Sequence, residues 1–154
     1  MAEQGVAQAM LVPTLFDKPL VATFDTPEQS ADGGAILLKA IDDELELTAR
    51  LAACLPEGRQ PGKIEHALPT RLRQRCVGLA CGSADANDAA HLKADPIHTL
   101  LGPRDPRTDP DLASQPTLSR VENGRGPRDL YRLTQTLADV VIAPHRARLA
   151  PPAR

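Results

Sequence analysis

Ser114-Gln-Pro-Thr-Leu-Ser-Arg-Val-Glu-Asn-Gly124 is the stretch that decides the fold, because it carries the marks of a helix start and a helix end within eleven residues. Its first serine is a preferred N-cap residue, and its proline falls in the first turn, where a missing N–H costs nothing. The closing Asn-Gly pair suits a helix C-terminus. The stretch therefore predicts a short helix over Gln115–Glu122, anchored in a core by Leu118 and Val121.

The first turns of this helix carry the residue types of a DNA-reading helix. A helix in the major groove contacts bases near its N-terminus, where Gln pairs with adenine and Ser, Thr or Arg reach bases or phosphates. The candidate DNA-binding residues are Gln115, Thr117, Ser119 and Arg120. The alternative is an ordinary surface helix that is polar at its start.

Downstream of this stretch the chain predicts its longest helix. Pro127 opens it, and the apolar positions at helical spacing include Leu133 and Val140. Pro144 should kink or end it, and we expect residues 144–154 to be a frayed tail.

Upstream, apolar spacing and helix-end residues predict four more helices. They cover residues 36–47, 48–55, 69–81 and 84–94. Ser83 is expected to cap the last of them and Asp95-Pro96 to stop it. Residues 102–112 are rich in proline and should form an exposed loop.

The N-terminal part differs from the rest. Leu20-Val-Ala-Thr-Phe24 has the β-branched and aromatic residues of a strand, although no second strand is predicted to pair with it. Residues 1–14 look like a flexible leader. The predicted fold class is mainly α: a short-helix bundle over residues 15–143 with one N-terminal strand and a helix-turn-helix-like element near 114–124.

The composition limits the core. The chain has 154 residues, of which 2% are aromatic, so Leu, Ala, Val and Ile must fill the interior. Its 15 Pro and 10 Gly break the chain often, and its three cysteines are an odd number. No signal peptide and no apolar run of about 18 residues are evident. We expect a cytoplasmic protein that does not contact membranes.

The charge is unevenly distributed, although the net charge is only −2. Residues 1–70 hold five Lys and Arg against eleven Asp and Glu, whereas residues 71–154 hold thirteen against nine. Arginine suits bidentate contact with phosphate, so the second part favours an anionic partner. The candidate phosphate contacts are Arg71, Arg73, Arg75, Arg125 and Arg128. Ordinary solvated charges are the alternative.

Neither a metal site nor a catalytic site is predicted. Cys76, Cys81, His91 and His98 have spacings that fit poorly with a structural zinc site. The acidic clusters fall on solvent faces or in a proline-rich loop, whereas two-metal chemistry needs carboxylates that converge.

Four collinear motifs resemble a large group of bacterial insertion-sequence transposases of the DDE class, which have an RNase H-like core. They are Leu15-Phe-Asp-Lys-Pro-Leu-Val-Ala-Thr-Phe-Asp25 with Asp32-Gly-Gly-Ala35, Gly62-Lys-Ile-Glu-His66 with Leu72-Arg-Gln-Arg75, Cys81-Gly with Asp85-Ala-Asn-Asp88, and Leu112-Ala-Ser-Gln-Pro-Thr-Leu-Ser-Arg-Val-Glu-Asn123. The resemblance covers residues 14–143.

The resemblance implies a function in DNA transposition. In such transposases an Asp-Asp-Glu triad holds two divalent metals, expected to be Mg²⁺, and its first Asp follows the helix that matches residues 127–143. That position lies beyond Arg154, so no residue here receives a catalytic role, and whether this chain is itself an enzyme stays open. Pro144 and Gly124-Arg-Gly-Pro127 depart from the family pattern.

The resemblance thus predicts a DNA-binding and assembly region that is catalytically incomplete. Its expected partner is DNA at the terminal inverted repeats, together with the transposase catalytic domain or a second copy of the chain. Two alternatives remain: a helix-turn-helix transcriptional regulator, and a transposase remnant without function.

Overall fold

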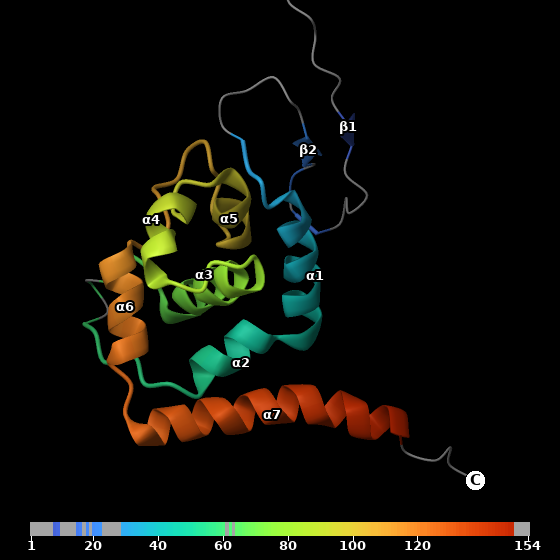
Figure 1. Ribbon diagram of the computed structural model, residues 1–154, viewed down its shortest axis with the longest axis vertical. Coiled ribbons are helices and arrows are strands. Elements are labelled where there is room, and N and C mark those ends of the chain that lie inside the picture. The colour runs from blue at the N-terminus through green and yellow to red at the C-terminus, as the bar shows by residue number, and fades with distance from the viewer. Residues whose placement is uncertain are drawn as a thin grey trace, which may run out of the picture.

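The computed structural model describes residues 8–9, 15–16, 18, 20–22, 29–60, 62 and 64–149. Within this part the fold is mainly α, as predicted, and Figure 1 shows the arrangement. The helices are α1 (Ile36–Leu45), α2 (Leu47–Ala53), α3 (Leu68–Ala80), α4 (Ala89–Leu92), α5 (Pro96–Leu101), α6 (Gln115–Asn123) and α7 (Pro127–Leu149). Two 3₁₀ turns, η1 (Gly33–Ala35) and η3 (Ala86–Asp88), precede α1 and α4. None of the described helices is long and apolar enough to cross a membrane.

Helix α3 occupies the middle of the bundle, with α2, α5 and α6 packed against it. The buried apolar residues form three small clusters instead of one large core. The cluster between α2, α3 and α6 contains Ala52, Leu55, Leu68 and Val121, and the one between η1, α3 and α5 contains Ala35, Val77 and Leu101. Small aliphatic side chains fill both, in agreement with the low aromatic content.

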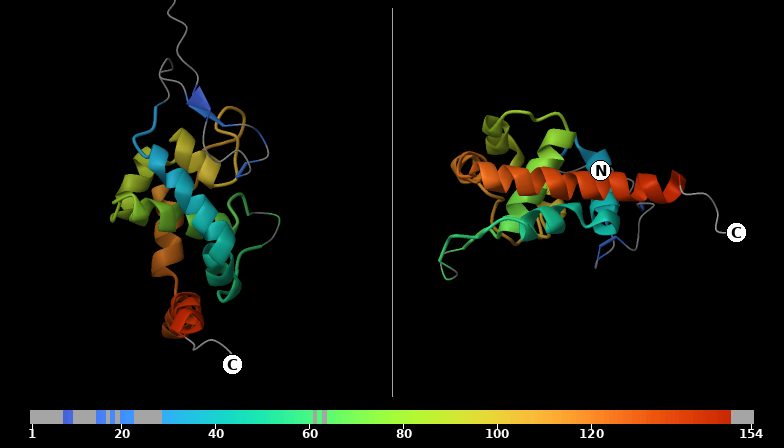
Figure 2. Two further views of the ribbon diagram at one scale, coloured as in Figure 1. Left: turned by 90° about the vertical axis from the view of Figure 1, so that its right-hand side faces the viewer. Right: turned by 90° about the horizontal axis from the view of Figure 1, so that it is seen from below.

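Helix α7 lies along one side of the bundle, where it packs on α2. Its C-terminal end projects past the other helices, as the right view of Figure 2 shows. The predicted end at Pro144 is wrong, because the helix continues through this proline to Leu149. Residues 141–146 are exposed, so any bend required by the missing N–H and the ring meets no packed neighbour.

The predicted N-terminal strand is not supported as an element of the fold. Only β2 (Val21–Ala22) remains of it, two residues long, and it pairs antiparallel with β1 (Gln8–Ala9). The expectation that it lacks a partner is therefore also wrong. Residues 23–24 lie outside the described residues, as do most of the predicted leader 1–14 and the tail after Leu149.

The helix predicted over residues 84–94 is also wrong in its limits. The segment contains η3 and the four-residue α4, and no helix begins at Ser83. Asp95-Pro96 begins a helix that the sequence did not predict, because the Asp95 carboxylate accepts hydrogen bonds from the N–H groups of Ile97 and His98 and caps α5.

Candidate nucleic-acid interface

Helix α6 is fixed by its buried side and by the chain before it. Leu118 and Val121 are buried, whereas Ser114 and Pro116 at its start are exposed. Ser114 has the extended backbone of an N-cap residue, and its carbonyl accepts hydrogen bonds from the N–H groups of Thr117 and Leu118 at 2.9 and 3.0 Å. Its hydroxyl lies 3.1 Å from that of Thr117 and caps no backbone group. The predicted helix is confirmed, but the cap expected from the Ser114 side chain is not formed.

The four predicted DNA-reading residues of α6 are not equally available. Arg120 is exposed, and Gln115, Thr117 and Ser119 are half-buried. The Ser119 hydroxyl accepts a hydrogen bond from Asn123 Nδ2 at 2.9 Å, and Thr117 is occupied by Ser114. Within the described part of the chain, the side chains of Gln115 and Arg120 have no hydrogen-bond partner. These two are the residues of α6 that are free to contact a base or a phosphate.

The three arginines of α3 are engaged within the bundle, each with an acid from a different segment. Arg71 is 4% exposed, and its Nη2 donates to Glu57 Oε2 at 2.9 Å. Arg73 Nε donates to Asp42 Oδ2 of α1 at 2.8 Å.

Arg75 connects α3 to α6. Its Nε donates to a carboxylate oxygen of Glu122, and its two Nη atoms donate to the carbonyls of Ser83 and Ala84 at 3.0 and 2.7 Å. DNA contact by Arg71, Arg73 or Arg75 stays a prediction. In this structure Arg71 holds the loop after α2, Arg73 contacts α1, and Arg75 holds α6.

The Glu57 carboxylate is paired with two arginines. Arg59 donates two hydrogen bonds to this carboxylate, at 2.8 and 2.7 Å, and Arg71 adds a third. The hydrogen bonds from Arg59 are the main reason that the pKa of Glu57 falls to about 2. Burial and the neighbouring Arg59 lower the pKa of Arg71, and the Glu57 carboxylate opposes this shift.

The connection from α6 to α7 is flanked by arginines. Arg125 in the three-residue turn donates to the carbonyls of Val121 and Pro56 at 3.2 and 3.1 Å, which fixes the turn. Arg128 and Arg132 follow at the start of α7, and both are exposed. Neither has a hydrogen-bond or ion-pair partner among the residues described. With Arg120 they form what we call the basic corner: Arg120, Arg128 and Arg132.

Sequence reasoning missed two side chains next to the basic corner. Tyr131 and Gln135 are exposed, and with Arg128 and Arg132 they follow the spacing i, i+3, i+4, i+7, which places all four on one face of α7. That spacing was present in the sequence, but the apolar stripe of the same helix was the stronger pattern.

A family model described as the transposase DDE domain, group 1, matches residues 12–151. The chain belongs to this transposase family. Its function therefore lies in transposition, a process that acts on DNA. No curated protein and no solved structure matches the chain. The family match favours a transposase over the transcriptional regulator that the sequence left as an alternative.

The long connection between α5 and α6 also favours a transposase over a helix-turn-helix regulator. In a helix-turn-helix motif a turn of about three or four residues joins the two helices. Here residues 102–114 separate α5 from α6, so the predicted helix-turn-helix-like element does not include α5.

The acidic triad of a DDE transposase holds two divalent metals, which requires carboxylates from separate elements to converge. Within residues 29–60, 62 and 64–149 no three carboxylates come together. The one group of three potential ligands in the described part is Asp32, Cys81 and His98. A cysteine and a histidine are poor ligands for Mg²⁺, so these residues do not fit the two-metal site and no catalytic step is assigned to them.

Proposed function

We propose that this chain is the DNA-engaging and assembly part of a DDE transposase, and that the α6–α7 region binds the ends of the element. The observation that carries this proposal is the contrast between two sets of arginines. Those of α3 are paired with carboxylates, whereas the basic corner is exposed and without partners among the described residues. Unpaired, exposed arginines are the groups that release counterions when they meet phosphate.

Within this region, we assign different roles to the two helices. Gln115 and Arg120 lie on α6, and we assign them the contacts with base edges in the major groove. Arg128 and Arg132 lie in the first two turns of α7 and would contact the phosphate backbone on the same side. Arg125 holds the turn between the two helices.

The short turn between α6 and α7 favours a second way in which this region could bind DNA. Only residues 124–126 separate α6 from α7, and Figure 1 shows the two helices crosswise to one another. This is the connection of a helix-turn-helix, in which the second helix reads the groove. Helix α7 would then read bases with Arg128, Tyr131, Arg132 and Gln135.

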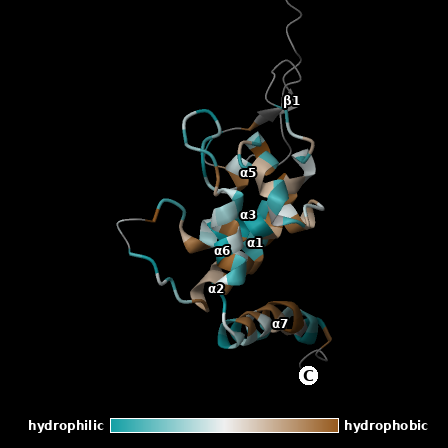
Figure 3. Cartoon of the chain, turned by 60° about the vertical axis from the view of Figure 1, so that its left-hand side comes forward, coloured by the Kyte–Doolittle hydropathy of each residue, from teal (hydrophilic) through white to brown (hydrophobic). Residues whose placement is uncertain are grey.

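The assembly role rests on the middle of α7. Figure 3 shows hydrophobic residues there between hydrophilic ends, and Leu137, Val141 and Ile142 are exposed. Exposed apolar residues grouped on one helix commonly mark a contact surface. The partners proposed for it are the transposase catalytic domain and a second copy of this chain.

We further propose that DNA cleavage and strand transfer need an acidic triad outside the described residues. The support is the placement of several described carboxylates, which engage other side chains or accept hydrogen bonds from backbone N–H groups. Asp42 binds Thr48 and Arg73, Asp85 accepts from the Asn87 N–H, and Asp105 accepts from the Arg107 N–H. Such carboxylates have structural partners and do not converge on a metal.

Fluorescence anisotropy tests the DNA proposal. The full chain is titrated into a labelled duplex with the terminal inverted repeat of its element, and into a scrambled duplex of equal length and composition. The expected result is tighter binding to the repeat, by roughly tenfold or more at moderate salt. Equal affinity for both duplexes would refute recognition of the ends, and no binding to either would favour a non-functional remnant.

A further inference from the structure

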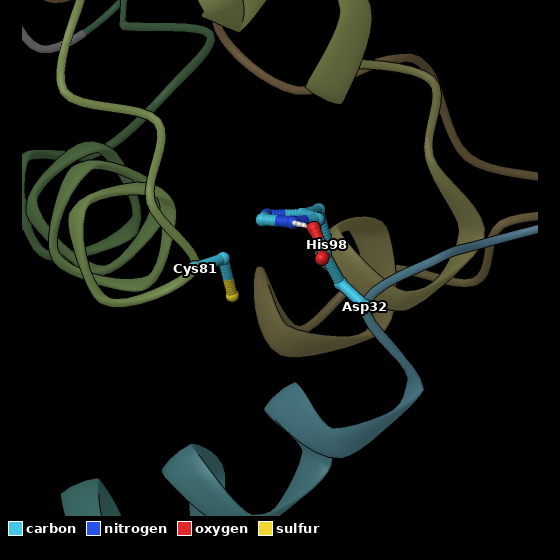
Figure 4. A group of neighbouring side chains, drawn as sticks. All are labelled: Asp32, Cys81 and His98. Atoms are coloured by element: carbon cyan, nitrogen blue, oxygen red, sulfur yellow. Dashed lines mark hydrogen bonds and ion pairs between the residues drawn. The ribbon is translucent and has the colours of Figure 1, made fainter.

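Asp32, Cys81 and His98 are far apart in the sequence and meet in space between three elements. Asp32 precedes η1, Cys81 ends α3, and His98 belongs to α5. One potential ligand atom from each lies within 4.8 Å of the other two. Figure 4 shows the Asp32 carboxylate against the His98 ring and Cys81 nearby on its own segment.

The histidine of this group is buried, and only one of its two ring nitrogens has a hydrogen-bond partner among the described residues. His98 is 2% exposed, and its Nε2 lies 2.8 Å from Asp32 Oδ2. Its other ring nitrogen, Nδ1, is buried without a hydrogen-bond partner among the described residues.

The chemistry of the three side chains selects the kind of ion. Thiolate, imidazole and carboxylate together are the ligands of zinc, whereas Mg²⁺ and Ca²⁺ take oxygen ligands. In a tetrahedral zinc site neighbouring ligand atoms are about 3–4 Å apart, given metal–ligand distances of about 2.0–2.3 Å. The three atoms are therefore within about 1 Å of that geometry.

A nucleophilic role for the thiol does not fit its surroundings. Burial raises the pKa of Cys81, and the carboxylates of Asp32 and Asp95 raise it further. An activated cysteine has the opposite shift, because the thiolate is the nucleophile.

We propose that Asp32, Cys81 and His98 form a zinc-binding site, with water as the fourth ligand. Access for that water is available on the side of Asp32, whose side chain is 27% exposed. The sequence spacing of Cys76, Cys81, His91 and His98 predicted no metal site. In the structure Asp32 lies with Cys81 and His98, whereas the other two residues lie elsewhere. Cys76 lines a hollow beside Leu38 and Arg73, and His91 is exposed on α4.

The site would join the three elements around one of the small core clusters. Cys81 itself packs on the cluster of Ala35, Val77 and Leu101, which lies between η1, α3 and α5. With no tryptophan in the chain and few other aromatics, this cluster buries little apolar area per residue. A metal bound only by the folded state would stabilise the chain by mass action. This role is independent of the proposed DNA binding.

Cobalt titration tests the site directly. The full chain is stripped of metal with a chelator and titrated with Co²⁺, which replaces Zn²⁺ and reports its ligands by absorption. The expected result is one equivalent bound, with the near-ultraviolet band of a thiolate–cobalt bond and the visible bands of tetrahedral coordination. Zn²⁺ should abolish both. Cys81→Ser should remove the thiolate band, and Asp32→Asn or His98→Gln should weaken binding by about tenfold or more.

Cys76→Ser is the matched control, since it alters another half-buried thiol of the same helix and should leave the titration unchanged. A measurement on the unaltered chain guards against misfolded variants: Zn²⁺ should protect Cys81 from alkylation, and leave Cys54 and Cys76 as reactive as before. The proposal is overturned by a thiolate band that survives Cys81→Ser, by the absence of any such band, or by alkylation of Cys81 that Zn²⁺ does not slow.

Discussion

The side-chain amide of Gln74 holds the backbone of Ala113 through both of its hydrogen-bonding groups. Gln74 Nε2 donates to the Ala113 carbonyl at 2.9 Å, and Gln74 Oε1 accepts from the Ala113 N–H at 3.1 Å. Ala113 is 1% exposed and directly precedes the N-cap of α6. A single side chain of α3 therefore fixes the point at which the chain enters α6.

Replacing Gln74 by methionine keeps the length of the side chain and removes both hydrogen bonds. Two buried backbone groups of Ala113 would lose their partner, so Gln74→Met should lower the free energy of unfolding by about 2–5 kcal/mol. Urea unfolding followed by circular dichroism measures the change. Gln135→Met, on the exposed side of α7, is the control and should stay within about 0.5 kcal/mol of the unaltered chain. Equal unfolding midpoints for the two variants would show that the Gln74 amide does not hold the chain.

Arg71 and Arg128 should differ in the same assay, although the sequence suggested one role for both. Removing the buried Arg71 leaves Glu57 with one arginine fewer and creates a void, so Arg71→Ala should cost about 1–3 kcal/mol of stability. Arg128→Ala removes an exposed side chain without a described partner and should change stability by less than about 0.5 kcal/mol. If Arg71→Ala leaves the urea midpoint unchanged, Arg71 is not a structural residue.

Glu57 should make the stability of the bundle depend on pH. Its pKa is about 2 in the folded chain against an ordinary value of 4.5, so the folded state favours the ionised carboxylate. A group with a lowered pKa stabilises the fold fully above its unfolded value, and this contribution is lost as the pH falls through the folded value. The free energy of unfolding should therefore decline from about pH 4.5 towards pH 2. Urea unfolding at a series of pH values should show a shallower decline for Glu57→Gln. A decline of equal steepness in this variant would assign the effect to other carboxylates.

The helices that the sequence predicted well have clear ends and a regular apolar spacing. The Pro69 and Gly82 positions that bound α3 are examples, and so is the Asn123-Gly124 end of α6. Asp95-Pro96 was ambiguous, because the same pair can stop one helix or cap the next. Only the packing of α5 against α3 decides between these outcomes.

The roles of the basic residues could not be predicted from the sequence in the same way. Arg71, Arg73 and Arg75 find their acids 14, 31 and 47 positions away, so local spacing contains no trace of the pairing. The Asp32–His98 contact spans 66 positions. Residue types identify which side chains can bind phosphate or metal, but the tertiary fold decides which of them are free.

Supercoiled plasmid tests the proposal that this chain lacks its own catalytic triad. Incubation of the purified chain with Mg²⁺ or Mn²⁺ should leave the plasmid supercoiled on an agarose gel, since the described carboxylates do not converge on a two-metal site. Nicking that disappears when one of the chain's own carboxylates is changed, for instance in Asp42→Asn, would mean that the active site had been misplaced. Asp42→Asn should instead weaken the contact between α1 and α3, because it loses the ion pair with Arg73.

Salt dependence of DNA binding should separate the free arginines from the paired ones. An arginine that neutralises one phosphate contributes about 0.9 to the slope of log K against log salt, so Arg128→Ala and Arg132→Ala should each flatten that slope by about one. Both should weaken binding to the terminal repeat and to the scrambled duplex alike. Gln115→Ala and Arg120→Ala should cost about 1–3 kcal/mol on the repeat and little on the scrambled duplex, if α6 reads bases.

The same titrations decide between the two arrangements of α6 and α7. If α7 is the reading helix, the selective loss should move to Tyr131→Ala and Gln135→Ala, whereas Gln115→Ala should have little effect on either duplex. Arg73→Ala is the matched control, because its guanidinium is paired with Asp42 of α1, and it should leave the salt slope unchanged. A slope that falls for Arg73→Ala as much as for Arg128→Ala would mean that the ion pair opens on DNA. The α3 arginines would then belong to the phosphate surface after all, and the basic corner would be only one part of it.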